Sequence, residues 1–401
     1  MILIKNGSIV INNELVKKDI LIEDNVITRI EDTIEGDYEI YDARGCLVMP
    51  GAVDVHVHLR EPGYEYKETV KTGSLSALKG GVTTIMSMPN LKPVPDNLDA
   101  LKVQLDRINS VNLINIYPYG AVTVNQKDEV MANIEELAPY VKAITDDGFG
   151  VNNLEVLEEA MKLAKKHDLV IASHAEDKVY KYAPEGEYVA VRREIEMAKK
   201  IGCKYHFCHM STKESFEAIR KAQQEGYTNI TCEVAPHHLV LNETMIKNGN
   251  WKMNPPLRSE ENRLATIEAL LDGTACMVAS DHAPHSKEEK NNPEYSKNLN
   301  GIIGLETMLP IIYTEFVKTG KITYERFIDI MVNNPAKVFN LPQRTISVGS
   351  VADIAVIDIE NKHVYEEAEI VSMGKNTPFI GFEYYGYTKY TFVNGKLAYK
   401  C

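Results

Sequence analysis

Short apolar runs predict β-strands at both ends of the chain. They fall at residues 2–7, 20–24, 26–30 and 46–48 near the N-terminus, and at 353–358, 390–393 and 396–399 near the C-terminus. Asn6-Gly7 between such runs is a hairpin signal, and Asn394-Gly395 separates two of the C-terminal runs. Neither end can bury a core alone, so we expect segments 1–49 and 345–401 to pair into one small β-sandwich.

Between residues 50 and 344 the pattern changes to alternating strands and helices. Apolar runs predict strands at 53–58, 83–88, 113–119, 141–146, 169–174, 205–209, 230–235 and 277–281. Helical periodicity lies between most of them, for example at 154–166, 213–224 and 262–271. Eight βα units in about 290 residues indicate a (β/α)8 TIM-type barrel, and hence the α/β class. A doubly wound open sheet is the rival interpretation.

Polar residues at the strand ends decide between these two folds. An open sheet gathers such residues at one switch point, whereas here they close almost every predicted strand. Eight of the 11 histidines lie at or just beyond the C-terminal end of a predicted strand: His56, His58, His174, His209, His237, His238, His282 and His285. Barrels carry their chemistry on this face, so the ring of polar residues favours a closed barrel with a catalytic site.

Composition narrows the choice of partners. The chain has 401 residues, with 44 Lys and Arg against 57 Asp and Glu, and a formal net charge of −13. This acidic balance argues against nucleic acid as a partner. No apolar run approaches the roughly 18 residues of a membrane span, and Lys5 comes too early for a signal peptide. We expect a cytoplasmic protein with a small-molecule or protein partner and no membrane contact.

The strongest local motif is Val53-Asp-Val-His56-Val-His58. Alternate side chains of a strand share a face, so Asp54, His56 and His58 point the same way, into the barrel. Two imidazoles at an inward strand end can chelate one divalent metal ion. The sequence therefore predicts a metal site at the end of the first barrel strand.

Other strand ends supply the remaining ligands. His174 and His209 offer two imidazoles for a second metal ion. Asp281 ends the eighth strand with a carboxylate, which can ligate weakly and exchange a proton with metal-bound water. We therefore expect a centre with two metal ions.

Two neighbouring metal ions usually share a bridging ligand. The fourth predicted strand, Val141-Lys-Ala-Ile-Thr-Asp-Asp147-Gly148, offers a lysine and two aspartates. If Asp147 points inward, Lys142 faces the helices and is an outward side chain rather than a bridge. Asp146 remains the alternative to Asp147, which we prefer because Gly148 lets the backbone turn tightly after it.

Six motifs carry a resemblance to a known family. They are Asp54-Val-His56-Val-His58-Leu-Arg60-Glu-Pro62-Gly63, Met88-Pro-Asn90, Thr145-Asp-Asp147-Gly148, Cys208-His209-Met-Ser211, Met253-Asn254-Pro-Pro-Leu-Arg258 and Ser280-Asp281-His-Ala-Pro-His285. Together they resemble the type I dihydroorotases of the amidohydrolase superfamily, in order and over nearly the whole chain. The resemblance implies reversible hydrolysis of (S)-dihydroorotate to N-carbamoyl-L-aspartate, used in the ring-closing direction in de novo pyrimidine (UMP) biosynthesis.

The resemblance also implies the roles of site residues. By the family's pattern, two Zn²⁺ bind per chain, one to His56, His58, Asp147 and Asp281 and the other to Asp147, His174 and His209. A zinc-activated hydroxide attacks the amide carbonyl, and Asp281 is the catalytic acid and base. The implied substrate-binding residues are His58, Arg60, Asn90, Asn254, His285, Asn300 and Gly301. The Arg60 guanidinium is a planar, permanently charged fork suited to the ring carboxylate.

Two other functions remain open at this point. A dihydropyrimidinase (hydantoinase) or allantoinase resembles the same barrel and His-x-His motif, but usually carries a bridging lysine and lacks the Arg60 and Asn90 pair. A catalytically inactive scaffold for a partner enzyme is the second alternative, although such relatives tend to lose metal ligands that are all present here. The resemblance also allows a homodimer or a complex with aspartate transcarbamoylase.

Several polar features have less specific interpretations. Residues 286–298 form either a solvated loop or a mobile lid. Segment 177–202 is shorter than the family's usual connection, which could alter a lid, a subunit contact or the enclosure of the second metal. We interpret His237 and His238 as supporting or structural, and we expect His206, opposite His209 on its strand, to pack against the helices.

Overall fold

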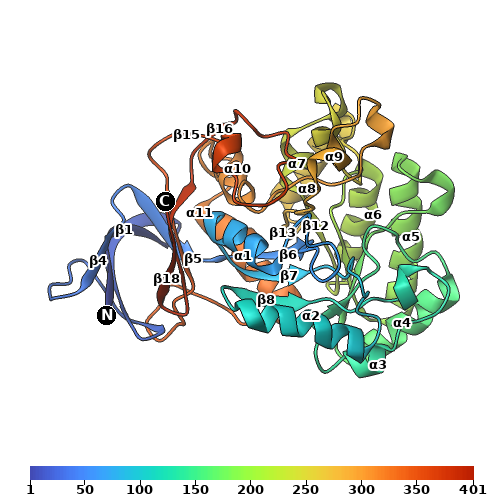
Figure 1. Ribbon diagram of the computed structural model, residues 1–401, viewed down its shortest axis with the longest axis horizontal. Helices are drawn as coiled ribbons and strands as arrows, with labels where there is room; N and C mark the ends of the chain where they lie inside the picture. Colours follow the sequence, from blue (N-terminus) through green and yellow to red (C-terminus); the bar gives the residue numbers. More distant parts are fainter.

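Eight short parallel strands form a closed barrel in the computed structural model, which describes residues 1–401 (Figure 1). The strands are β6 (Ala52–Val57), β7 (Val82–Ser87), β8 (Asn115–Pro118), β9 (Ala143–Ile144), β10 (Val170–Ser173), β11 (Lys204–Phe207), β12 (Ile230–Val234) and β13 (Met277–Val278). Hydrogen bonds link β6, β7 and β8 in that order into one sheet. They link β9, β10, β11, β12 and β13 in that order into another. Parallel bridges between Gly120 and Ile144 and between Val57 and His282 connect the two sheets at both edges. The predicted (β/α)8 barrel is confirmed.

Helices pack around this barrel. They are α1 (Val70–Lys79), α2 (Leu98–Val111), α3 (Ile134–Leu137), α4 (Leu154–Lys166), α5 (Pro184–Ile201), α6 (Lys213–Gln224), α7 (Pro236–Val240), α8 (Glu260–Asp272), α9 (Lys287–Lys290), α10 (Met308–Ile312), α11 (Tyr324–Ile328) and α12 (Asn334–Val338). The predicted helices 154–166 and 213–224 match α4 and α6. α8 begins two residues before its predicted start because the Ser259 side chain caps it by accepting a hydrogen bond from the Asn262 backbone.

None of these helices is long and apolar enough to cross a membrane.

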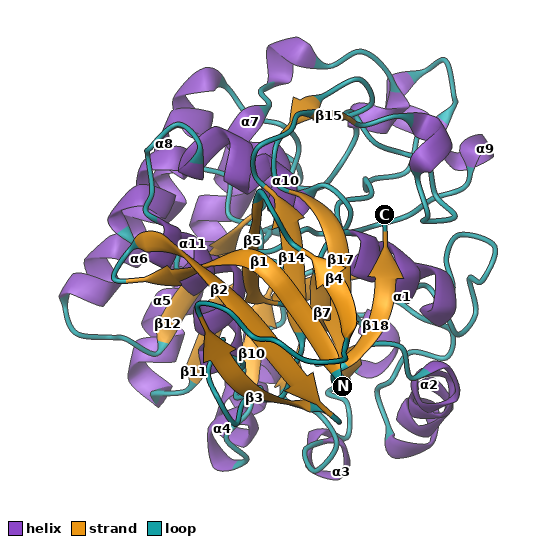
Figure 2. Ribbon diagram, turned by 90° about the vertical axis from the view of Figure 1, so that its left-hand side faces the viewer, coloured by secondary structure: helices purple, strands orange, loops and turns teal.

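The two ends of the chain share one eight-stranded sheet, which faces the viewer in Figure 2. It contains β1 (Ile2–Ile11), β2 (Glu14–Glu23), β3 (Val26–Glu31), β4 (Glu39–Asp42) and β5 (Cys46–Pro50), together with β14 (Ile354–Asp358), β17 (Tyr387–Val393) and β18 (Lys396–Lys400). β15 (His363–Val364) and β16 (Glu383–Tyr384) pair separately. Antiparallel pairing of β5 with β14 joins the two ends. The predicted β-sandwich is confirmed as a terminal β-unit of both chain ends: its strands belong to one hydrogen-bonded sheet around its own apolar core, which includes Ile20, Val48 and Phe392.

The prediction of a hairpin at Asn6-Gly7 is wrong. β1 continues through both residues and carries a bulge there, with Asn6 in the left-handed region at φ 64°. A Cβ at Gly7 would lie 2.4 Å from Cγ2 of Val48, so glycine permits the close approach of the neighbouring strand. The chain turns from β1 to β2 at Asn12-Asn13 instead, with φ values of 49° and 61°.

Strands that precede candidate ligands end earlier than the apolar pattern predicts. β11 ends at Phe207 rather than 209, and β13 ends at Val278 rather than 281. His209 and Asp281 follow these ends with φ values of 36° and 49°, and Arg60 follows β6 with a φ of 63°. Residues other than glycine seldom adopt this region, and such strain gathers at functional sites. Beyond these turns, strand alternation no longer determines where a side chain points.

Candidate metal centre and substrate pocket

The six predicted metal ligands come together at the C-terminal ends of the barrel strands. His56 lies in β6 and His58 just after it, whereas Asp147, His174, His209 and Asp281 follow β9, β10, β11 and β13. All six side chains are buried. Barrel closure brings His58 and Asp281, which are 223 residues apart in sequence, to 3.3 Å between Nε2 and Oδ1.

One group of donor atoms lies between the first and last barrel strands. Nε2 of His56 is 3.3 Å from Oδ1 of Asp147 and 3.4 Å from Oδ1 of Asp281. Nε2 of His58 is 3.4 Å from Oδ2 of Asp147 and 3.3 Å from Oδ1 of Asp281. Two imidazole nitrogens and two carboxylates therefore face one another around a single point.

A second group shares one member with the first. Oδ1 of Asp147 is 3.6 Å from Nδ1 of His174 and 3.3 Å from Nε2 of His209. The two ring nitrogens are 3.0 Å apart. Asp147 belongs to both groups, which is the arrangement of a bridging ligand. The structure places Asp147 here and leaves Lys142 exposed.

The donor atoms fit divalent metal ions. Ligand atoms about 2.1 Å from a tetrahedral metal are about 3.4 Å from one another, close to the separations in both groups. His56 directs its Nδ1 to Oε1 of Glu233 at 2.7 Å, while its buried Nε2 has no hydrogen-bond partner. A carboxylate on the far nitrogen is the usual support for a metal-bound imidazole, because it orients the ring and leaves Nε2 free to coordinate.

Both aspartates are ionised in this environment. Burial disfavours the charged carboxylate, but His56, His174 and His209 outweigh it and hold the pKa of Asp147 well below its usual range. The same competition between burial and the neighbouring His56 and His58 lowers the pKa of Asp281. Each carboxylate is thus available as a metal ligand, and Asp281 is also available to accept a proton.

Asp146 has a structural role. Its Oδ1 accepts hydrogen bonds from the backbone of Val122 at 2.8 Å and Thr123 at 3.1 Å, and its Oδ2 accepts one from the Thr123 hydroxyl. Burial raises the pKa of this carboxyl to about 6. These bonds fix the loop beside β9 and direct Asp146 away from the candidate metal groups.

A cavity of about 420 Å³ opens next to the metal groups. All the predicted substrate-binding residues line it: His58, Arg60, Asn90, Asn254, His285, Asn300 and Gly301. Asp147 and Asp281 line it as well. A small molecule in this cavity would therefore lie against both the metal groups and the predicted binding side chains.

Several of these side chains are already positioned by neighbours. Nε of Arg60 donates to the Pro284 carbonyl at 3.2 Å, and the Asn90 amide donates to the Asp147 carbonyl at 2.7 Å. The Asn254 amide lies 3.0 Å from Nε2 of His174, on the ring side opposite the metal group. Buried oxygens of Asn90 and Asn254 have no hydrogen-bond partner. These oxygens remain available to donors on a bound molecule.

Gly301 forms one wall of the cavity at a φ of 132°. A Cβ there would lie 2.7 Å from Cβ of Ala283 and 3.0 Å from Nε2 of His285. Only glycine combines this backbone conformation with the close packing around it. The main chain is therefore the part of residue 301 that a ligand can contact.

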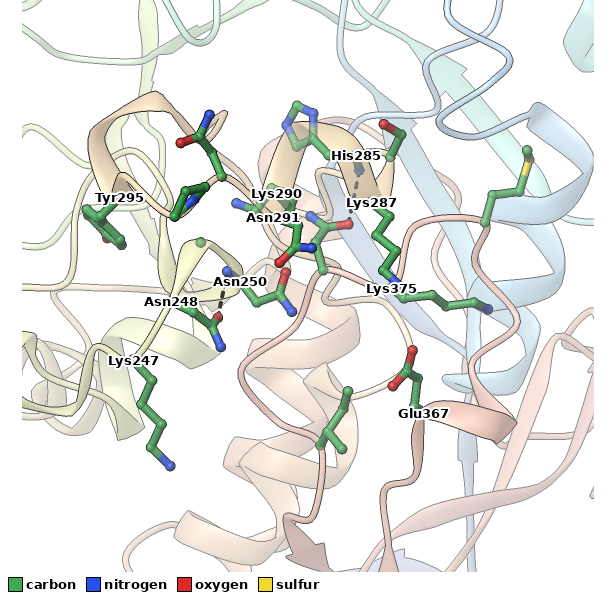
Figure 3. Close-up of a pocket in the computed structure, with 17 residues that line it drawn as sticks. Lys247, Asn248, Asn250, His285, Lys287, Lys290, Asn291, Tyr295, Glu367 and Lys375 are labelled. Atoms are coloured by element: carbon green, nitrogen blue, oxygen red, sulfur yellow. Dashed lines mark hydrogen bonds between the residues drawn. The ribbon is translucent and has the colours of Figure 1, made fainter.

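The segment after β13 is anchored through its length. Nζ of Lys290 in α9 donates to the carbonyls of Lys252, Leu299 and Gly301, each at 2.8 Å. The Asn298 amide ties the segment to itself through the Asn292 carbonyl at 3.0 Å. His285 also lines a second, polar hollow of about 560 Å³, to which Lys287 and Lys290 of α9 contribute, shown in Figure 3. Residues 291–297 are exposed, as in the solvated-loop interpretation of 286–298, and these contacts anchor the loop beside the cavity. The mobile lid stays a prediction.

The expectation that His206 packs away from the site, against the helices, is wrong. Its Nε2 lies 3.1 Å from Oε2 of Glu233, and its Nδ1 lies 2.8 Å from the Thr231 hydroxyl. Glu233 in turn bonds His56, so His206 faces the barrel interior. The prediction assumed that alternation continues to His209, but β11 ends before that residue and the backbone reverses there.

Three charged residues of the site were not predicted from the sequence. Glu233 supports His56 from within β12, and the one charged residue in a strand of otherwise uncharged residues is a signal that could have revealed it. Lys67 lines the cavity, and Glu289 binds Lys67 from α9. Neither lies at a strand end, so periodicity holds no signal for them.

His238 connects the site to its surroundings. Its Nε2 donates to the Pro255 carbonyl at 3.1 Å, next to Asn254. His237 is buried beside it, and burial lowers the pKa of its imidazole to about 4. Both histidines are consistent with the supporting or structural role predicted for them.

Comparison with known proteins agrees with this geometry. Residues 47–398 match the family model described as "Amidohydrolase family". The chain is 43% identical to a protein named dihydroorotase from Listeria monocytogenes serotype 4b (strain F2365), covering 100% of this chain and 99% of that one. It is 42% identical to a dihydroorotase from Bacillus subtilis (strain 168), over 99% and 98% of the two chains. Among solved structures, L-hydantoinase (dihydropyrimidinase) from Arthrobacter aurescens superposes with a TM-score of 0.88 at 27% identity, covering 100% of this chain and 96% of that one.

Proposed function

Because the chain belongs to the amidohydrolase family, we propose that it is a dihydroorotase. It interconverts (S)-dihydroorotate and N-carbamoyl-L-aspartate, and pyrimidine biosynthesis uses the ring-closing direction. Full-length relatives at 41–43% identity that carry this name support the proposal. The geometry of the site supports the same activity independently.

The observation that carries the proposal is a cationic wall beside two metal-binding groups. Arg60 and His285 line one side of the cavity, with their Nη2 and Nε2 atoms 3.5 Å apart, and Asn90 lines the same cavity. A planar guanidinium next to other donors is suited to a carboxylate. A cyclic amide with a ring carboxylate fits such a pocket, whereas a neutral ring would leave the half-buried charge of Arg60 without a counter-charge on the ligand.

Two Zn²⁺ per chain suit the donor atoms best. His56, His58, Asp147 and Asp281 would hold one ion, and His174, His209 and the shared Asp147 would hold the other. Imidazole nitrogen and carboxylate oxygen are ligands that zinc prefers. Zinc at such a site polarises an amide carbonyl and lowers the pKa of a bound water.

The chain's own residues orient the substrate and move the proton. Arg60, His285 and the second amide hydrogen of Asn90 bind the ring carboxylate, while Asn254 and the main chain at Asn300 and Gly301 hydrogen-bond the ring amides. Asp281, ionised and buried, takes the proton of the attacking water and gives it to the ring nitrogen that leaves. These contacts hold the substrate's ring carboxylate and its amide bond in fixed positions during both proton transfers.

A hydantoinase- or allantoinase-like activity is the second candidate. The likeness to L-hydantoinase, with a TM-score of 0.88 at 27% identity, favours this alternative. Against it, the lysine nearest to the bridging position, Lys142, is exposed, and Asp147 lies between the two groups. Arg60 also has no role with a substrate that lacks a carboxylate.

The test is hydrolysis of (S)-dihydroorotate by the purified, zinc-loaded chain, with metal content measured on the same sample. Turnover with about two zinc ions per chain supports a self-sufficient binuclear dihydroorotase. Absence of turnover at full metal content, also after addition of aspartate transcarbamoylase, would refute the proposal. Hydantoin and allantoin would then be the next substrates to test.

Cytoplasmic location, homodimer formation and association with aspartate transcarbamoylase belong to the same proposal. Analytical ultracentrifugation of the chain alone and with the transcarbamoylase measures both assemblies. A single monomeric species in each experiment would contradict both.

A further inference from the structure

Lys67 forms part of the cavity wall, yet it is neither a candidate metal ligand nor one of the predicted substrate-binding residues. It lies between β6 and α1, on the segment that also carries Arg60, and is only 8% exposed. Its Nζ is 2.9 Å from Oε1 of Glu289 and 3.3 Å from Nδ1 of His285. A buried lysine directed at a substrate-binding histidine affects how that histidine can bind.

The contacts of His285 determine its protonation state. Its Nε2 lies 2.7 Å from the Asn300 carbonyl oxygen, which only accepts hydrogen bonds, so Nε2 carries a hydrogen. Its Nδ1 lies 3.3 Å from the Lys67 ammonium, which only donates, and 3.4 Å from Oε2 of Glu289, which only accepts. Because the Ser286 backbone already donates to this oxygen and Lys67 is the nearer group, we infer that Nδ1 is bare. The ring is therefore neutral, with its hydrogen on Nε2. Burial and the nearby Arg60 and Lys67 agree, since they lower the pKa of this imidazole to about 3.

Glu289 holds Lys67 in place. Its Oε1 also accepts a hydrogen bond from the Tyr66 hydroxyl at 3.0 Å, and its Oε2 accepts one from the Ser286 backbone at 3.0 Å. Oε2 lies 3.4 Å from Nδ1 of His285. A carboxylate and a bare ring nitrogen both need donors, and the Lys67 ammonium supplies hydrogens to both.

This arrangement prepares the wall for a carboxylate. Nε2 of His285 lies 3.5 Å from Nη2 of Arg60. Its one hydrogen is donated to the Asn300 carbonyl in the free protein, and a carboxylate bound at Arg60 would share that hydrogen. Arg60 and Lys67 carry two positive charges against the single negative charge of Glu289. The wall therefore keeps a net positive charge, with the Arg60 guanidinium next to the shared hydrogen of His285.

We propose that Lys67 is a positioning and specificity-determining residue, which holds His285 as a neutral Nε2–H donor beside Arg60 and so selects ring substrates that carry a carboxylate. The identity of that substrate rests on the proposed function. The protonation state of His285 does not, because it follows from contacts in the free protein.

The kinetic test uses Lys67→Met, Lys67→Arg and, as a matched control, Lys287→Met in the zinc-loaded enzyme. Lys287 is an exposed lysine of the same short helix as Glu289 and contributes nothing to the cavity. Lys67→Met should raise the KM for dihydroorotate by about tenfold or more, with a smaller effect on kcat. Lys67→Arg restores a charged donor and should keep KM within about threefold of the unmodified enzyme, as should Lys287→Met.

The second test is a spectroscopic signature of the tautomer. In ¹⁵N-histidine NMR of the unmodified zinc-loaded protein, the His285 resonances, assigned by their loss in His285→Gln, should show a protonated Nε2 and a bare Nδ1. Lys67→Met should shift the Nδ1 resonance, because its donor is gone. The unmodified protein alone tests this point, so the proposal stays falsifiable if a variant fails to fold.

The two tests separate this proposal from the proposed function. A hydrogen on Nδ1 of His285 in the unmodified protein, or an unchanged KM in folded Lys67→Met, would overturn the role of Lys67. If the unmodified enzyme does not act on dihydroorotate, the proposed function fails, and with it the substrate selection. The NMR result still decides whether Lys67 sets the state of His285.

Discussion

Asp281 is the residue with the most demanding position in the site. It lies just beyond β13 in a left-handed backbone conformation, and its carboxylate contacts both histidines of the His-x-His motif. Those contacts keep it charged despite burial. A residue that is buried, strained and ionised is costly to the fold, which indicates that its role is chemical.

Asp281→Asn should lower kcat by about 10²- to 10⁴-fold, because an amide cannot accept and return the proton. Metal content should stay close to two per chain, since the other five ligands remain. Activity and metal analysis on one sample check both expectations. Asp32→Asn, at an exposed position far from the site, is the control. A variant with full metal content and unchanged kcat would exclude Asp281 as the acid and base.

Arg60→Ala should mainly weaken substrate binding. Loss of a charged hydrogen-bond donor to a carboxylate costs about 1.5–3 kcal/mol, which corresponds to an increase in KM of about 10- to 100-fold. Steady-state kinetics with dihydroorotate separate this from an effect on kcat. An equal loss of kcat at unchanged KM would instead place Arg60 in the chemical step.

At the scale of elements, the barrel strands were predictable and their ends were not. The apolar pattern located all eight strands, because most of them bury side chains on both faces. It overextended β11 and β13, because apolar residues continue past the point where the backbone turns. His206 was misplaced for this reason, and the hairpin at Asn6-Gly7 failed because a bulge and a turn favour the same residues.

One side chain of α9, that of Lys290, anchors the segment after β13 beside the cavity. Lys290 donates to the carbonyls of Leu299 and Gly301, which flank the cavity's Asn300, and to the carbonyl of Lys252, just before Asn254. It therefore couples two stretches of chain that contribute substrate-binding residues.

Lys290→Met should remove three hydrogen bonds from a charged donor and lower the free energy of unfolding by about 3 kcal/mol. KM for dihydroorotate should rise as well, because Asn300 and Gly301 lose their support. Thermal denaturation and kinetics, each compared with Lys287→Met in the same helix, measure the two effects. Equal melting temperatures of the two variants would show that the anchor is unimportant.

At the scale of the whole molecule, the site exists because the barrel closes. The candidate ligands come from five strands, and the parallel bridge between Val57 and His282 brings the first and last of them together. Four imidazoles and two carboxylates then crowd one small volume. Bound metal ions would coordinate these imidazole nitrogens and carboxylate oxygens together, and so stabilise the group.

Removal of metal by a chelator should abolish activity and lower the melting temperature, and zinc should restore both. At free zinc one hundred times above its dissociation constant, binding adds about 2.7 kcal/mol per site to stability. Differential scanning calorimetry with metal analysis measures this linkage, and chelator already saturated with zinc is the control. Full activity in a metal-free sample would contradict a metal-dependent mechanism.

The amino-acid sequence by itself determined the barrel, the terminal β-unit and the residues that line the centre. Period-2 and period-3.6 patterns are local, and a parallel barrel brings every strand end to one face, so His56, His174 and Asp281 were predictable as neighbours. Only the tertiary structure decided which side chains support them. Glu233 meets His56 across 177 residues, and Lys67 meets His285 across 218. Such pairs depend on how the closed barrel and its loops pack, and local periodicity contains no information about that packing.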